Sequence, residues 1–108
     1  MNQILYLLCR HDLNIICGWQ PYPSTSLSKH CGLSLYQTRK ELKKLKEQGL
    51  VVSDIQTVTD DEGTAILRGY TITKKAKETE EYKKAHEEER AICIKVFGYD
   101  VIGELKKE

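Results

Sequence analysis

The sequence predicts a mixed α+β fold that is mainly helical, with one two-stranded β-hairpin and a long helix near the C-terminal end. Three observations lead to this prediction. Apolar residues recur at helical spacing in the first part of the chain. Two segments rich in Val, Ile and Thr flank the acidic turn sequence at 60–63. The highly charged stretch 74–97 contains neither glycine nor proline, so nothing interrupts a helix before Gly98.

The composition favours a small globular protein of the cell interior. The chain has 108 residues, of which 40% are apolar and 31% charged, which is enough for one domain with a modest core. No apolar run approaches the ~20 residues of a membrane span, and the first eight residues lack the basic start and cleavage site of a signal peptide. We therefore expect a cytoplasmic location and no contact with a membrane. The four cysteines lack Cys-x-x-Cys spacing, so we expect reduced, mostly buried thiols at Cys9, Cys17, Cys31 and Cys93.

Two helices and an extended link are expected in the first third of the chain. Apolar residues at helical spacing predict a first helix from Asn2 to about Cys17. Gly18 and two prolines end this helix and leave a short extended link up to Pro23. A second helix follows and runs to about Cys31. The hydroxyl side chains at its start are suitable N-caps, namely Ser24, Thr25 and Ser26.

The third helix, over about 34–48, has the clearest local signals. Gly32 supplies the turn before it, and Ser34 with Gln37 forms a capping box at its start. Gly49 is expected to end it in the left-handed conformation. One stripe is predicted to face the core, with Leu35, Thr38, Leu42 and Leu45. The opposite side carries polar and basic residues, namely Tyr36, Gln37, Lys40, Lys43 and Lys44, with Arg39 on the flank.

The net charge of +1 conceals an uneven distribution of charge along the chain. Six basic and two acidic residues lie between positions 24 and 50, whereas one basic and four acidic residues lie between 51 and 73. The positive potential therefore concentrates on the second and third helices. A local basic patch of this kind attracts phosphate even when the whole protein is nearly neutral.

The remaining elements are a hairpin, a helix and a tail. Leu50 to Thr59 and Ala65 to Thr73 are expected to form the two strands. We expect a first domain over 1–73, a long helix over 74–97, and a loosely ordered tail over 98–108.

Several of these segments resemble winged helix-turn-helix regulators of the MarR and PadR type. The resemblance rests on Gly32-Leu33-Ser34, on Leu42 and Leu45, on Gly49-Leu50-Val51, and on Gly69-Tyr70-Thr71-Ile72-Thr73. It covers Ser24 to about Lys77. It implies a non-enzymatic transcription regulator that binds double-stranded DNA, with the third helix in the major groove and the hairpin as the wing.

The resemblance also implies which side chains touch DNA. Base reading would fall to Leu35, Tyr36, Gln37, Arg39, Lys40 and Lys43. Lys44 and the residues at the starts of the second and third helices would contact the phosphate backbone. The residues at these helix starts are Ser24, Thr25, Ser26, Lys29 and Ser34. The wing tip, Asp60-Asp61-Glu62, departs from the family pattern because carboxylates repel phosphates. This leaves Thr64 and Arg68 as the expected wing contacts.

The charged segment 74–97 has two interpretations. It is either a solvated helix held by charge pairs four residues apart, or a helix whose apolar stripe packs on the first helix or on a second subunit. A homodimer is favoured, because the apolar cluster near its end is large for so small a chain, and it would place two recognition helices about 34 Å apart. The expected dimer interface contains Tyr82, Ile92, Val96, Phe97 and Tyr99.

Other functions remain as alternatives. The acidic wing and the near-neutral charge would suit a protein-interaction or assembly module of a phage, plasmid or replication complex. Metal binding would use Cys9, His11, His30 and Cys31, although zinc-type spacing is absent. We expect no cofactor and no metal, and no catalytic motif is recognisable. An unknown small-molecule effector would fit between the first helix and the C-terminal one.

Overall fold

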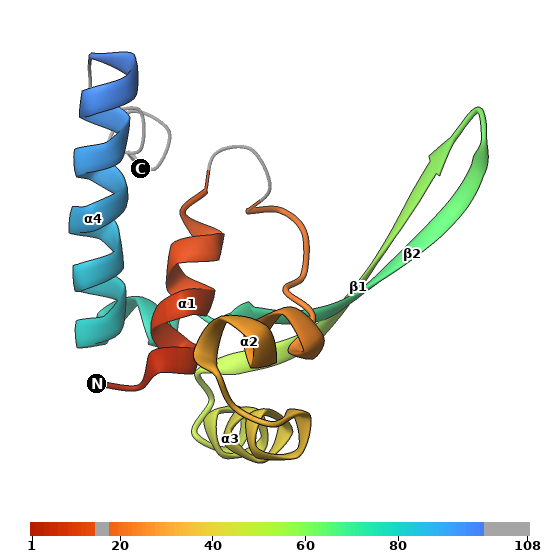
Figure 1. The fold of residues 1–108 in the computed structure, drawn as a ribbon, viewed down its shortest axis with the longest axis horizontal. Coiled ribbons are helices and arrows are strands. Elements are labelled where there is room, and N and C mark those ends of the chain that lie inside the picture. Colours follow the sequence, from red (N-terminus) through yellow and green to blue (C-terminus); the bar gives the residue numbers. More distant parts are fainter. Residues whose placement is uncertain (15–17, 99–108) are drawn as a thin grey trace.

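The computed structural model describes residues 1–14 and 18–98. Its elements are α1 (Gln3–Asp12), α2 (Ser24–Cys31), α3 (Leu35–Glu47), β1 (Val51–Asp60), β2 (Gly63–Ile72), the 3₁₀ turn η1 (Lys75–Glu78) and α4 (Glu80–Phe97). Helices dominate, the two strands pair antiparallel, and a helix follows the hairpin (Figure 1). The predicted mixed α+β fold class is confirmed, and the order of the elements is consistent with a winged-helix-like layout.

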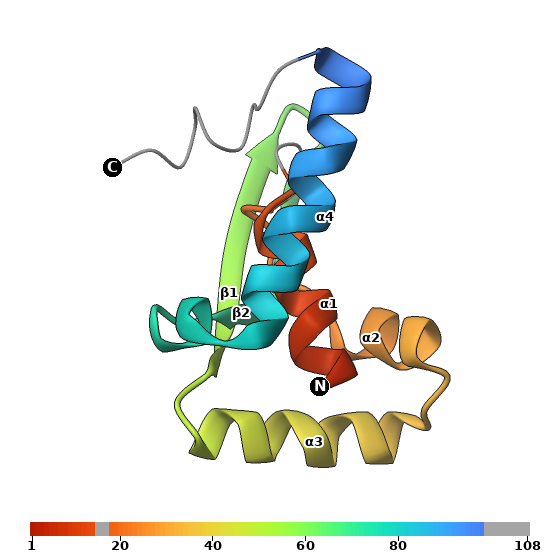
Figure 2. The same cartoon turned by 90° about the vertical axis from the view of Figure 1, so that its left-hand side faces the viewer.

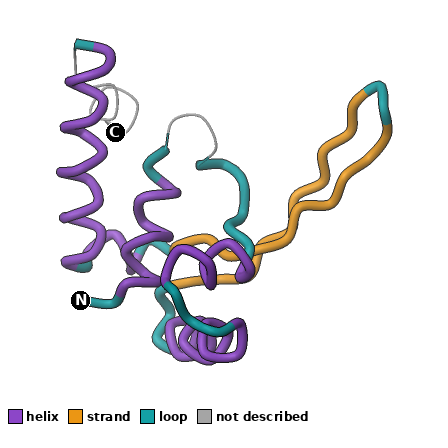
Figure 3. Tube along the Cα trace, viewed as in Figure 1, coloured by secondary structure: helices purple, strands orange, loops and turns teal. Residues whose placement is uncertain are grey.

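The helices form a body from which the hairpin projects. α1 and α4 run side by side in the same direction, α2 lies beside the start of α1, and α3 lies beneath them as a separate layer (Figures 1 and 2). The bases of β1 and β2 lie within the body, and their outer parts continue as a free ribbon (Figure 3). No helix in the described ranges is both long and apolar enough to cross a membrane.

The core lies where α1 meets the other elements. Its fully buried leucines come from α1, α2 and α3 and from Leu13 just after α1, and Val51 at the start of β1 joins them. Each fully buried leucine contributes about 1.5–3 kcal/mol relative to exposure. The large side chains at its centre are Leu5, Leu8, Leu13, Leu27 and Leu42.

α1 is shorter than predicted. It begins after Asn2, whose side chain accepts a hydrogen bond from the Leu5 amide at 3.0 Å, and it ends at Asp12 rather than near Cys17. Leu13 lies beyond the helix but remains buried. Leu13 therefore fits the helical spacing of apolar residues because it is buried, although it is not part of the helix. The last part of the prediction, residues 15–17, falls outside the described residues.

The link before α2 pairs with the hairpin. Tyr22 and Tyr70 exchange two backbone hydrogen bonds of 3.0 Å each. Gly69 permits this approach, because a Cβ at that position would lie 2.5 Å from the Tyr22 carbonyl carbon and oxygen. The N-cap of α2 is Pro23, in extended conformation, so the prediction that Ser24, Thr25 or Ser26 caps the helix is wrong. These three residues form the first turn itself.

The predicted single helix over 74–97 is wrong at its start. The chain forms η1, turns extended at Thr79 (φ −84°, ψ 160°) and only then enters α4 at Glu80. Thr79 causes this break, since its hydroxyl donates to the Ala76 carbonyl at 2.6 Å and accepts from the Tyr82 amide at 3.3 Å. Two acidic residues, Glu80 and Glu81, then favour the helix start through the helix dipole.

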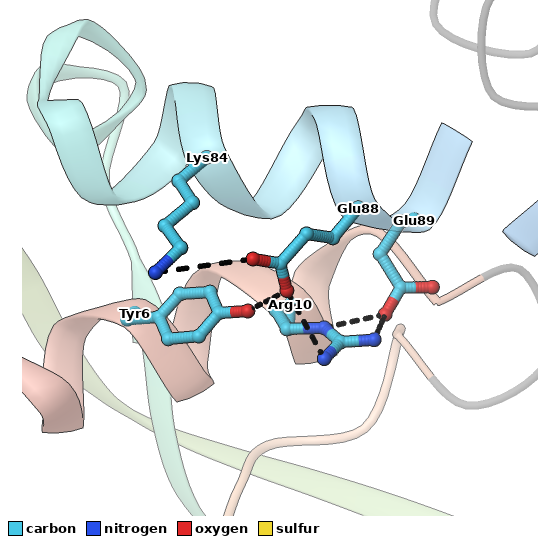
Figure 4. A network of polar contacts seen from close by, with 5 residues as sticks. All are labelled: Tyr6, Arg10, Lys84, Glu88 and Glu89. Atoms are coloured by element: carbon cyan, nitrogen blue, oxygen red, sulfur yellow. Dashed lines mark hydrogen bonds and ion pairs between the residues drawn. The ribbon is translucent and has the colours of Figure 1, made fainter. Parts of the chain in front are cut away.

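Polar contacts fasten the middle of α4 to α1 of the same chain (Figure 4). Arg10 Nε donates to Glu89 Oε1 at 2.8 Å, and its Nη1 lies 3.4 Å from Glu88 Oε2. The Tyr6 hydroxyl donates to Glu88, and Lys84 Nζ lies 4.0 Å from Glu88 Oε1. Burial, together with the bond to Glu88, raises the pKa of the Tyr6 phenol. These contacts attach α4 to the body of the protein along α1.

Candidate nucleic-acid interface

The start of α3 is fixed by the predicted capping box. Ser34 Oγ accepts from the Gln37 amide at 3.1 Å, and Gln37 Oε1 accepts from the Ser34 amide at 3.4 Å. Thr38 is fully buried, and its hydroxyl donates to the Ser34 carbonyl at 2.9 Å. These bonds satisfy amides that a helix otherwise leaves without partners, so the first turn is held in place.

The other end of α3 is tied to the base of the hairpin and to η1. Gly49 adopts φ 76°, and the Leu50 amide donates to the Leu45 carbonyl at 3.0 Å, which closes the helix in a Schellman motif. Lys75 Nζ donates to the Gln48 carbonyl at 2.8 Å, and the Thr73 hydroxyl donates to the Gly49 carbonyl at 2.6 Å. These bonds attach the C-terminal end of α3 to the hairpin base and to η1.

The two faces of α3 separate as the sequence predicts. Thr38, Leu42 and Leu45 are buried, while Leu35 lies half-buried at the edge of the stripe. Tyr36 is 76% exposed. The other outward side chains are also exposed, namely Gln37, Arg39, Lys40, Lys43 and Lys44.

Most of the cations on this face form no ion pair with a carboxylate of the described chain. Lys44 Nζ lies 3.5 Å from Glu41 Oε1. Within the described part of the chain, Arg39, Lys40 and Lys43 form no ion pair. Together with Leu35 and Tyr36, these three cations line a shallow hollow along the helix. Apolar surface next to cations is the combination that base edges and phosphates require.

A second hollow, of about 370 Å³, lies between the start of α2, α3 and the base of the wing. Arg39 from α3 and Arg68 from β2 both line it, although they lie far apart in sequence. The carboxylate of Asp54, also in its lining, accepts hydrogen bonds from the Ile55 amide (2.9 Å) and from Gln56 Nε2 (3.1 Å). The hollow thus brings together four residues that the sequence proposed separately as DNA contacts: Ser24, Thr25, Arg39 and Arg68.

The register of the hairpin separates its charges. Residues directly opposite each other share a face, and Ile55 opposes Arg68, Thr57 opposes Ile66, and Thr59 opposes Thr64. Asp54 and Asp60 lie on the other face. The remaining acids, Asp61 and Glu62, occupy the two-residue turn at the far end of the ribbon from α3 (Figure 1).

The acidic tip is therefore separated from the basic face of α3, and the two predicted wing contacts, Thr64 and Arg68, share one face. Sequence reasoning did not single out their neighbours on that face. Period-2 alternation from Arg68 would have found them. They include Ile55, which is 62% exposed, Ile66, which is 57% exposed, and Thr57.

The remaining predicted contacts differ in accessibility. Thr25 and Lys29 are exposed on α2, whereas Ser24 and Ser26 are half-buried. Lys46 is a basic residue of α3 that the predicted contacts omit, and it is exposed with Nζ 3.3 Å from Ser53 Oγ.

Both histidines considered for a metal site lie within hydrogen-bond distance of a backbone carbonyl oxygen. His11 Nε2 lies 2.6 Å from the Gln20 carbonyl oxygen, and His30 Nδ1 lies 2.8 Å from the Ser26 carbonyl oxygen. Cys9 is fully buried, while His30 is exposed. In the ranges 1–14 and 18–98, no three His, Cys, Asp or Glu residues are grouped as metal ligands would be.

The predicted dimer residues fall into three groups. Tyr82 packs half-buried against the core of its own chain. Ile92 and Val96 are 46% and 66% exposed, and Ile94 between them is 44% exposed. The Phe97 side chain and Tyr99 lie outside the described residues.

Comparison with known proteins gives no match: no protein-family model, no curated protein and no solved structure is similar to this chain at a significant level.

Proposed function

We propose that this protein is a cytoplasmic transcription regulator that binds double-stranded DNA through α3. One observation carries the proposal. α3 is held at both ends by hydrogen bonds, and its outer face presents Arg39, Lys40 and Lys43 without acidic partners in the described chain. A fixed helix with a free cationic face suits insertion into the major groove, which is about 12 Å wide.

The side chains on this face have the chemistry for reading bases. Arg39 has the planar fork that bonds guanine O6 and N7, and Lys40 or Lys43 can reach guanine or phosphate. Gln37 uses its oxygen in the capping box, which leaves its amide nitrogen as a donor. Tyr36 and Leu35 offer apolar surface for a thymine methyl group.

The flanks of α3 would hold the duplex in register. Ser24 and Thr25 offer hydroxyl groups beside the hollow that contains Arg39 and Arg68, and both arginines suit phosphate oxygens. The wing would approach the duplex with the face that carries Arg68, Thr57 and Thr64, and Asp60 near the tip would lie on the opposite face.

We further propose that the protein acts as a homodimer. Ile92 and Val96 lie four residues apart on one side of α4, and both are exposed in the single chain. Pairing of two copies there would cover apolar surface and duplicate the recognition helix, as a two-fold DNA site requires.

Salt-dependent binding tests the proposal. Fluorescence anisotropy of a labelled random duplex should report binding at low salt that weakens steeply as salt rises. In the triple variant Arg39→Ala, Lys40→Ala, Lys43→Ala, log K should fall less steeply with log salt. The magnitude of the slope should decrease by roughly 2–3, because each phosphate contact contributes about 0.9.

A matched triple variant controls for lost charge. Lys77→Ala, Lys83→Ala, Lys95→Ala removes three exposed cations from outside the interface and should leave the slope unchanged. Equal losses in both triple variants, or no binding at low salt, would contradict the proposal.

The wing favours a second candidate function, a protein-interaction or assembly module. Ile55 and Ile66 are more than half exposed on one face of a free ribbon with an acidic tip, which suits a basic, partly apolar protein surface. The double variant Ile55→Ser, Ile66→Ser distinguishes the candidates: it should abolish capture of a protein partner in the second case and leave low-salt DNA binding nearly intact in the first.

A further inference from the structure

A hollow of about 400 Å³ lies between η1 and α4, apart from the two hollows around α3. In Figure 2, η1 and the first half of α4 face the viewer, and α3 lies beneath them. The lining of the hollow between η1 and α4 is mainly basic and aromatic: Lys77, Tyr82, Lys83, His86, Glu87 and Arg90. None of these residues also lines a hollow around α3.

The break at Thr79 brings these residues together. Lys83, His86 and Arg90 are spaced three and four residues apart, so they share one side of α4. Lys77 comes from η1, which the extended Thr79 turns against the start of α4. In one continuous helix, Lys77 and Arg90 would be separated by about 20 Å along the axis, without a hollow between them.

The charges in the hollow are unbalanced. Two lysines, Lys77 and Lys83, line it together with Arg90, and the lining contains one carboxylate, that of Glu87. In the described part of the chain, neither Lys77 nor Lys83 has a carboxylate within ion-pair distance. Like charges gathered in one place repel, and an anion bound among them would remove that repulsion and form charge-assisted hydrogen bonds.

Two rings give the hollow a less polar wall. The Tyr82 and His86 ring centroids lie 6.3 Å apart with an interplanar angle of 35°. A ligand with phosphate oxygens for the ammonium and guanidinium groups and a flatter organic part against these rings matches both kinds of surface.

We propose that the hollow between η1 and α4 binds a small phosphate-bearing molecule. The phosphate belongs to a free ligand rather than to the duplex, because the lining is separate from the surface proposed for DNA. The site is defined by its own residues, and its occupation does not depend on whether α3 binds DNA.

Titration with inorganic pyrophosphate tests the proposal. Two-dimensional amide NMR of the full chain is followed at constant ionic strength, so that general screening does not change. We expect saturable shifts concentrated over residues 77–90. The double variant Lys77→Gln, Lys83→Gln should weaken binding about tenfold or more, because two cations near the anion are lost.

The matched control is Lys40→Gln, Lys43→Gln, which removes two exposed lysines from α3 instead. It should retain wild-type affinity for pyrophosphate, and the amide spectra of both variants show whether the fold is kept. Shifts that do not saturate, that follow α3, or that are equally weakened in both variants overturn the proposal.

A DNA-binding measurement on the same double variant distinguishes a free phosphate ligand from the DNA backbone. Lys77→Gln, Lys83→Gln should bind duplex DNA as the wild type does. Loss of DNA affinity in this variant would assign the hollow to the DNA backbone and overturn the proposal of a free ligand. If the wild type binds no DNA at all, the proposed function is wrong. The pyrophosphate titration then still decides separately whether the hollow binds a phosphate-bearing molecule.

Discussion

Gly69→Ala should loosen the attachment of the wing to the body. The added Cβ would lie 2.5 Å from the Tyr22 carbonyl carbon and oxygen and 2.8 Å from the Pro21 carbonyl carbon. Ordinary contact needs about 3.5 Å or more, so strand and link must separate by about 1 Å. A shift of that size stretches both 3.0 Å hydrogen bonds between Tyr22 and Tyr70 beyond good geometry.

The cost follows from these contacts. Two weakened hydrogen bonds at about 1 kcal/mol each, with about 1 kcal/mol for the steric clash, give a loss of about 2–3 kcal/mol. For a domain of this length the melting temperature should fall by about 10 °C. No positive φ is involved at Gly69, so the effect comes from space alone.

Thermal and urea unfolding measure this loss. The control is Thr71→Ala, on the same face of β2, which lowers strand propensity without a clash and should cost less than about 1 kcal/mol. If Gly69→Ala is as stable as that control, the close packing of the link on β2 is not needed, and the account of how the α2 start and wing base are held together is wrong.

Three further predictions concern the body and the start of α3. Arg10→Met should cost about 1–2 kcal/mol in urea unfolding, because Glu89, only 13% exposed, loses its partner; Lys44→Met, which removes a surface pair, should cost less than about 0.5 kcal/mol. Burial, reinforced by nearby carboxylates, raises the pKa of the Cys9 thiol to about 12. The unfolded thiol titrates near about 8.5, so the stability from this group is complete below that pH and declines as pH rises toward 12. Cys9→Ala should therefore make the alkaline loss of stability shallower between about pH 9 and 10.5, and an unchanged slope would refute this. Ser34→Ala should cost about 1 kcal/mol and speed amide exchange at Gln37, and unchanged exchange there would show that the capping box is not formed in solution.

The parts of the fold that the sequence predicted are those with short-range chemical signals. Ser34 with Gln37, and Gly49 after a run of helical residues, determine their helix ends within a few positions. The hairpin strands were predicted within a few residues because the acidic turn and the β-branched residues lie next to each other in sequence. The exposed face of α3 followed from the 3.6-residue period alone.

Long-range contacts and competing caps were not predictable in this way. Thr79 ends one helical segment and begins another, yet it stands among strong helix formers where no glycine or proline marks a break. Arg10 meets Glu88 and Glu89 across more than 75 positions, and only the packing of α4 on α1 brings them together. For the same reason, the sequence did not show that Arg39 and Arg68 line one hollow.

Amide shift mapping of the full chain with a short duplex at low salt tests the central claim most directly. The account predicts that the largest shifts fall on residues 34–44, with smaller ones at 24–25 and near Arg68, and that α4 hardly changes. Largest shifts on α4 or at the wing tip, or no shifts even at low salt, would contradict the assignment of the outer face of α3 as a DNA-binding surface.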